Sequence, residues 1–146
     1  PFSSTKTATH QYTTAGTKTI VLEVRDSGGL VGTTTRQVDV AANTPPTAAF
    51  TVTPAAGGTT DTVFTFNASV CEDAEDETAD LQVRWDWESD GTWDTAYSTT
   101  KTATHQYTSA GTKTVTLQVR DTLGMADTET KSVSVTDTGN LDVTVQ

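Results

Sequence analysis

The sequence of 146 residues holds little positive charge and almost no cysteine. Cys71 is its one cysteine, so no disulfide can form within the chain. Lys and Arg total 9 against 19 Asp and Glu, which leaves a net charge of −10. Nucleic acids and anionic membrane surfaces attract clustered basic side chains. The charge balance therefore argues against both of these partners and favours cations.

Long apolar runs and helical patterns are missing as well. No apolar segment approaches the roughly 18 residues of a transmembrane helix, so we expect no membrane insertion. No window shows the apolar spacing of an amphipathic helix. Threonine is abundant instead, and its β-branched side chain favours strands. These features predict an all-β chain.

A long internal repeat organises the chain. The segment STKTATHQYTTAGTKTIVLEVRDSGG, which starts at Ser4, returns as TTKTATHQYTSAGTKTVTLQVRDTLG from Thr99, an offset of 95 residues. A period of this length matches one sandwich domain and is far longer than a solenoid repeat. The repeat predicts residues 1–43 as the C-terminal half of one module, 44–137 as a complete module, and 138–146 as a tail or the first strand of a following module.

Alternating apolar residues predict about seven strands in the complete module. We expect strands over 49–53 and 62–70, and further strands around Trp85, Leu117 and Val133. The residues predicted to face the core are Phe64, Phe66, Ala68, Val70, Leu81, Val83, Trp85, Trp87, Val115, Leu117, Val119, Val133 and Val135.

Two stretches of this module carry a specific pattern: WDWESDGTWDT from Trp85 to Thr95, and HQYTSAGTKTVTLQVRD from His105 to Asp121. Together with the opening PPTAAFTVTP, they closely resemble the PKD (polycystic kidney disease) domain family. The resemblance implies an immunoglobulin-like β-sandwich in a secreted or cell-surface protein. Members of that family occur mainly in extracellular proteins, where they resemble spacers, adhesive repeats of surface layers, or appendages of secreted proteases and polysaccharide-degrading enzymes. Several bacterial members bind calcium. The usual family motif WDFGDG is WDWESDG here, which adds acidic groups to the turn.

Four acids around this turn, Asp86, Glu88, Asp90 and Asp94, are candidate metal ligands. Their spacing, D-x-E-x-D-G-x-x-D, alternates acids ahead of a glycine that permits a sharp turn. Calcium prefers six to eight oxygen ligands, so the pattern predicts a calcium site. The alternative is that Asp90 and Gly91 form a plain turn and that the acids are solvated.

A second candidate cation site joins Asn43 and Asp121. Asp121 ends a predicted strand before a glycine turn, and in a sandwich that end approaches the linker at Asn43. A cation held there would lie between modules. The acid-rich loop 72–80 either helps to bind cations or is a charged surface loop.

The aromatic residues divide into core and surface groups. Trp85 is predicted to anchor the core, because a central Trp can bury more apolar area than its neighbours. Tyr107 precedes a glycine turn and a strand, which is typical of a tyrosine corner whose hydroxyl ties down a loop. Trp93 lies beyond the acidic turn, where an exposed ring can contact polysaccharide. The alternative for Trp93 is an isolated surface aromatic without a ligand.

Residues 1–43 carry the later strands of a module, predicted over 8–12, 17–26 and 33–40, without the Trp-bearing strands that would cover them. About 40 residues seldom fold unaided, so these strands need partners. Two explanations remain open. Either the missing strands lie upstream in a longer parent chain, or another copy supplies strands as donor-strand assembly does. The alternating tail 140–146 is one strand available for such donation.

The sequence supports two hypotheses about function. The first is a rigid bead in a filament, surface layer or adhesin stalk, whose partners are neighbouring modules of the same chain or identical subunits. The second is a polymer-binding accessory module of a secreted hydrolase, with a polysaccharide or protein polymer as its ligand. Catalysis by this chain is not expected, because no Ser-His-Asp, Cys-His or zinc-ligand arrangement is present.

Overall fold

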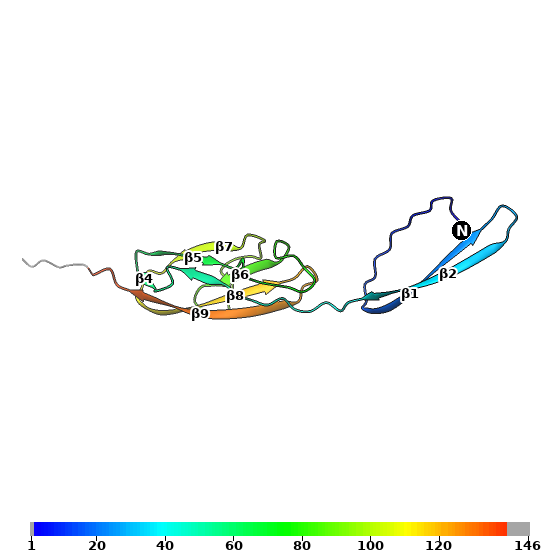
Figure 1. Ribbon diagram of the computed structural model, residues 1–146. Coiled ribbons are helices and arrows are strands. Elements are labelled where there is room, and N and C mark those ends of the chain that lie inside the picture. The colour runs from blue at the N-terminus through cyan, green and yellow to red at the C-terminus, as the bar shows by residue number, and fades with distance from the viewer. Residues whose placement is uncertain (1, 140–146) are drawn as a thin grey trace, which may run out of the picture. The chain divides into compact units, whose positions relative to one another are not determined.

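The computed structural model describes residues 2–139, which divide into two compact units, one up to Asn43 and one from Thr44 onward. All regular structure in this part of the chain is β-strand, as Figure 1 shows. Residues 2–139 contain no helix with the length and apolar character needed to span a membrane. The tail strand predicted over 140–146 lies outside the described residues.

The larger unit is a sandwich of two sheets. One sheet holds three strands in the order β3 (Thr51–Thr53), β5 (Val63–Asn67) and β7 (Thr102–Gln106). The other holds four in the order β4 (Gly58–Thr59), β9 (Ala126–Thr136), β8 (Gly111–Arg120) and β6 (Gln82–Asp86). Neighbouring strands are antiparallel, except that β4 pairs with β9 in parallel. These seven strands, counted among residues 44–139, agree with the predicted number.

The core lies between the two sheets and is centred on Trp85. Its ring lies 5.2 Å from that of Phe50 and 5.6 Å from that of Phe66, and it stacks on Trp87 at 5.4 Å. Aromatic side chains bury the largest apolar areas, so this group dominates the burial that holds the sheets together. The predicted core positions that the structure buries are Phe64, Phe66, Ala68, Leu81, Val83, Trp85, Trp87, Val115, Leu117, Val119, Val133 and Val135.

Val70 was predicted to face the core and instead is 49% exposed. The reason is local, because β5 ends at Asn67 and the chain then turns. The turn is closed by a hydrogen bond of 3.1 Å from the Cys71 amide to the Ala68 carbonyl. Alternation of side chains between two faces holds only while the backbone stays extended, so the prediction fails at the turn.

The smaller unit is one antiparallel hairpin, β1 (Gly16–Arg25) with β2 (Val31–Val40). Its register repeats that of β8 and β9 at the offset of 95 residues, because Gly16 pairs with Val40 as Gly111 pairs with Val135. Each hairpin turn contains a glycine with positive φ, 89° at Gly29 in the first hairpin and 93° at the equivalent position in the second. The hairpin is therefore encoded by its own residues.

The strand predicted over 8–12 is not formed, and this prediction was wrong. Its equivalents at offset 95 are residues 103–107, most of which belong to β7. β7 exists because it pairs with β5 over five residue pairs. Residues 2–43 contain no strand that takes the place of β5, so residues 8–12 have no ladder to join.

Burial in the core predicts a sharp difference between two leucines of the same unit. Leu117 is fully buried and Leu123 is 76% exposed. Leu117→Ala should lower the free energy of unfolding by about 2–5 kcal/mol, because it removes buried methyl groups and leaves a cavity. The matched control Leu123→Ala should change it by less than ~0.5 kcal/mol. Urea denaturation followed by Trp fluorescence measures both changes, and equal losses would contradict the described core.

Candidate functional site

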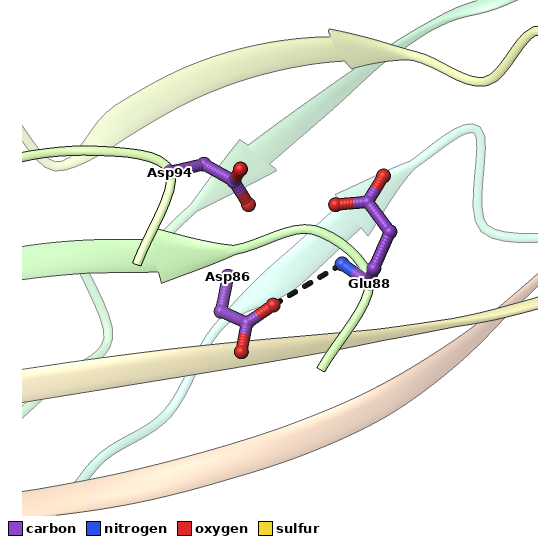
Figure 2. A group of neighbouring side chains, drawn as sticks. All are labelled: Asp86, Glu88 and Asp94. Atoms are coloured by element: carbon purple, nitrogen blue, oxygen red, sulfur yellow. Dashed lines mark hydrogen bonds between the residues drawn. The ribbon is translucent and has the colours of Figure 1, made fainter. Parts of the chain in front are cut away.

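The candidate site forms where the chain leaves β6 and folds back along it. Asp86 is the last residue of β6, and the amide of Asp94 later donates to the Trp85 carbonyl at 2.9 Å. Gly91, with φ of 89°, allows the reversal between them. As a result Asp86, Glu88 and Asp94 lie together, with one carboxylate oxygen of each within 4.8 Å of the others (Figure 2).

Asp86 is the buried member of this group, with 2% exposure. Its carboxylate accepts hydrogen bonds from the amides of Glu88 at 3.3 Å, Asp90 at 3.2 Å and Gly91 at 2.9 Å. These bonds compensate for the loss of water around the charge. The Asp94 carboxylate likewise accepts from the Trp87 amide at 2.8 Å. Both carboxylates are thus held in place by the backbone of the loop.

Asp90 does not join the group, although the sequence spacing included it among four ligands. Its side chain is exposed and accepts a hydrogen bond of 2.7 Å from the amide of Thr92. Side-chain spacing along a strand does not continue through a turn, and Asp90 lies in the turn itself. The structure therefore brings three of the four predicted acids together.

The surroundings of Glu88 disfavour its charged form. Burial raises the pKa of Glu88, and the charges of Asp94, Asp86 and Asp90 raise it further. His105 Nε2 lies 3.9 Å from a Glu88 carboxylate oxygen. Burial lowers the pKa of His105, which works against a positive charge on that ring. A divalent cation would relieve the repulsion among the carboxylates.

Aromatic packing supports the base of the loop. The His105 ring stacks on Trp87 with 4.8 Å between centroids, and Tyr107 meets His105 edge-on at 4.6 Å. The Tyr107 hydroxyl donates a hydrogen bond of 3.0 Å to the Trp87 carbonyl. This bond confirms the prediction that the Tyr107 hydroxyl ties down a loop. Burial raises the pKa of Tyr107 well above its usual range, so the hydroxyl keeps its proton.

Asp121, a member of the second candidate site, is held by the turn that follows β8. Asp121 is 3% exposed, and its carboxylate accepts hydrogen bonds from the amides of Leu123 at 2.9 Å and Met125 at 2.8 Å. Asn43 belongs to the other compact unit, so the pairing of Asn43 with Asp121 stays a prediction.

The acid-rich loop 72–80 reaches the Asp121 turn. Asp76 accepts hydrogen bonds from the amide and the hydroxyl of Thr122 at 2.8 and 3.0 Å. Asp73 Oδ2 is buried and, within the described residues, has no hydrogen-bond partner. The loop is therefore tied to the end of the sandwich, and Asp76 has a structural role there.

Trp93 is half-buried, and one face of its ring is covered. The Arg84 guanidinium lies 4.1 Å above that ring and 4.4 Å from Tyr97, and Arg120 lies 3.8 Å from Tyr97 on the same sheet. This row of alternating rings and guanidinium groups was not predicted. The available signal was alternation, because Arg84 and Arg120 each lie next to buried residues and so point outward. A sugar ring can stack only on the part of Trp93 that Arg84 leaves open.

Comparison with known proteins gives a consistent result. A family model described as the PKD domain matches residues 43–136. A solved structure of carbohydrate-binding modules from the β-sandwich superfamily is 33% identical, with a TM-score of 0.58. It is matched over 68% of this chain but only 38% of its own length, so most of that protein lies outside the match. The search of curated proteins gave no match.

Two solved PKD domains are matched over almost their whole length. The PKD1 domain of Vibrio anguillarum Epp is 25% identical, with a TM-score of 0.50, and the match covers 66% of this chain and 99% of that domain. The PKD domain of an M14-like peptidase from a Thermoplasmatales archaeon is 20% identical, with a TM-score of 0.51. That match covers 65% of this chain and 99% of that domain, and it bears on the fold alone.

The raised pKa of Glu88 predicts how stability changes with pH when no cation is present. The pKa of Glu88 is higher in the folded state than in the unfolded state, so ionised Glu88 destabilises the fold. This destabilisation is fully present above the folded-state pKa and is relieved as the pH falls through that pKa. Glu88→Gln should therefore raise the thermal midpoint at pH 7 in EDTA, and the gain should shrink as pH falls toward the ordinary value of 4.5. The control Glu77→Gln, at an exposed position outside the group, should show no gain. An unchanged midpoint for Glu88→Gln at pH 7 would contradict the raised pKa of Glu88.

Proposed function

This chain belongs to the PKD domain family, whose model spans residues 43–136, and on that premise we propose that it is a structural bead of an extracellular filament, surface layer or adhesin stalk. Its fold is the all-β, immunoglobulin-like sandwich, and the solved structures to which it is similar fit a non-catalytic accessory module. The partners in this role are neighbouring modules of the same chain or identical subunits.

The observation that carries the proposal is the way in which the module holds its own first residues. Pro46 is buried, and Thr47 exchanges backbone hydrogen bonds of 2.7 and 3.3 Å with Glu72. The amide and hydroxyl of Thr44 both donate to Glu75, at 3.1 and 2.9 Å. Pro45 and Pro46 further restrict the backbone of this segment. A segment fixed in this way supports a stiff attachment of the module to whatever precedes it.

Calcium bound by Asp86, Glu88 and Asp94 is the second part of the proposal. Carboxylate oxygens are the ligands that calcium prefers, and the backbone amides already orient Asp86 and Asp94. Calcium needs six to eight oxygens, so water or further protein oxygens would complete the shell. A bound ion would tie the loop that follows β6 to the end of the strand and so stiffen the module.

Calcium should raise the thermal midpoint of the full chain relative to EGTA. At a calcium concentration 100 times the dissociation constant, the gain is about 2.7 kcal/mol, which for a domain of this size is on the order of 10 °C. Asp86→Asn and Asp94→Asn should each remove the shift, because each removes one carboxylate charge from the group. Asp90→Asn is the matched control, since Asp90 lies in the same loop outside the group, and it should keep most of the shift. Differential scanning calorimetry measures the midpoint of each of the four proteins in calcium and in EGTA.

Two outcomes of this measurement would change the proposal. A shift that survives Asp86→Asn and Asp94→Asn but is lost in Asp121→Asn would move the ion to the second candidate site. Equal midpoints in calcium and EGTA would leave a spacer without a cation, and the calcium part would fail.

A second candidate function is a polymer-binding accessory module of a secreted hydrolase. It is favoured by the likeness to carbohydrate-binding modules and by the row of Trp93, Tyr97 and two arginines on the outer face of the β6–β8 pair. Planar rings on a sheet surface suit contact with sugar rings, although Arg84 covers one face of Trp93.

Retention on insoluble polymer distinguishes the two functions. The structural bead predicts that the chain stays in solution when it is mixed with microcrystalline cellulose or chitin. Retention that is lost in Trp93→Ala and kept in Trp85→Phe would favour the second function, because Trp85 is buried and cannot touch a polymer. A pull-down assay, in which the bound fraction of each protein is measured against polymer concentration, quantifies the retention.

A further inference from the structure

The hairpin of β1 and β2 presents an apolar face that the described residues leave largely exposed, although Phe2, Ser3 and Thr5 line a shallow hollow together with Leu22. Ile20, Leu22, Val24 and Val38 form this hairpin apolar face, and they are 42%, 56%, 60% and 44% exposed. Their equivalents at the repeat offset are Val115, Leu117, Val119 and Val133, which are 0%, 0%, 0% and 4% exposed. The same sequence pattern is thus core in one unit and surface in the other.

The hairpin is already in the shape that the complete module uses. The ten residue pairs of β1 with β2 have the register of β8 with β9 at every position. The turn is the same too, since the Leu30 amide donates to Asp26 Oδ1 at 2.9 Å and the Met125 amide to Asp121 Oδ1 at 2.8 Å. A two-stranded hairpin is at best marginally stable alone in water, so this preformed face gains stability from a cover.

The complete module shows what fits on such a face. β5 lies in the opposite sheet and contributes Phe64 and Phe66, while β6 joins the edge of β8 and contributes Val83 and Trp85. The free edge of β1 is the equivalent of that edge, because β1 pairs with β2 alone among the described strands.

We propose that the hairpin apolar face is the docking surface for the N-terminal half of a PKD module, of the kind that residues 44–98 form. The occupant adds a Trp-bearing strand to the edge of β1 and lays a Phe-bearing sheet over Leu22. Residues 44–98 of a folded copy do not serve, because β8 and β9 already cover them. The partner is therefore an N-terminal half that has no hairpin of its own.

One difference between the two hairpins affects how firmly the partner's first strand is held. In the complete module Asp127 and Glu129 of β9 accept hydrogen bonds from the amides of Ala48 at 2.9 Å and Phe50 at 2.8 Å. The equivalents of these two acids are Gly32, which has no side-chain acceptor, and Thr34, which has a shorter hydroxyl in place of a carboxylate. The first strand of the partner is thus held less firmly than residues 48–50 are.

Hydrogen exchange on an extended chain tests the proposal. The full chain is compared with one in which a second copy of residues 44–98 is joined directly ahead of Ser4, which restores the spacing of the complete module. The amides of β1 and β2 should exchange at least about 10-fold more slowly in the extended chain. Residues 99–137 serve as a folded reference in both molecules. If the β1 and β2 amides stay as fast as in the full chain while residues 99–137 remain protected, the proposal is overturned.

Two neighbouring substitutions separate the apolar face from the opposite one. Leu22→Asp in the extended chain should abolish the new protection, because its equivalent Leu117 is fully buried. Val21→Asp should keep it, because Val21 points to the outer face and its equivalent Thr116 is partly exposed. Equal effects of the two would overturn the proposal. So would protection of β1 in the unextended chain that rises with protein concentration, because a second copy would then be the cover.

A gain-of-stability variant gives an independent readout. Gly32→Asp with Thr34→Glu restores the two acceptors that β9 provides, and a Cβ at Gly32 meets no atom within 4 Å. In the extended chain the pair should raise the midpoint of the first module by several degrees, while the midpoint of the original complete module, residues 44–137, stays unchanged. A midpoint that does not rise would mean that the partner does not lie over β2 as residues 48–50 lie over β9.

Discussion

The burial of one apolar face of a β-hairpin is the constraint on which the rest of this structure depends. The chain builds nearly the same hairpin twice, with the same register and the same turn. Only the second is covered by Phe66, Trp85 and their neighbours, and only there do Val115, Leu117 and Val119 lose contact with water. Local sequence thus determines the hairpin, whereas burial of its face depends on the strands that precede it in the module.

The same burial shapes the candidate cation site. Trp85 and Trp87 both pack in the core, and Asp86, which lies between them at the end of β6, is buried where the following loop folds around its carboxylate. A buried carboxylate needs donors, and the amides of the following loop supply them. The loop that wraps Asp86 also returns Asp94 to its side. Convergence of the acids is therefore a consequence of the backbone hydrogen bonds with which this loop folds back along the end of β6.

Much of the fold and part of the site follow from the sequence, because alternation and repetition are local signals. They predict the core faces of β5, β6, β8 and β9, and they fail at Val70, where the strand ends, and at residues 8–12, which have no neighbouring strand to pair with. The motif spacing found Asp86, Glu88 and Asp94. It also included Asp90, because spacing cannot tell which side chains a turn sends outward. Alternation places Arg84 on the outer face, but no spacing in the sequence indicates that its guanidinium lies over Trp93.

The repeat also explains why a hairpin alone cannot form the acidic site. All three converging acids belong to the half of the module that precedes Thr99, and the repeat does not include that half. The covering hairpin contributes support instead, since Tyr107 bonds the Trp87 carbonyl and Thr116 bonds Ser89 at 2.5 Å. The first hairpin retains the tyrosine equivalent as Tyr12 but has Val21 in place of Thr116. A module completed on the first hairpin would therefore keep one of these two supports, so its acidic loop would be less firmly held than the loop after β6.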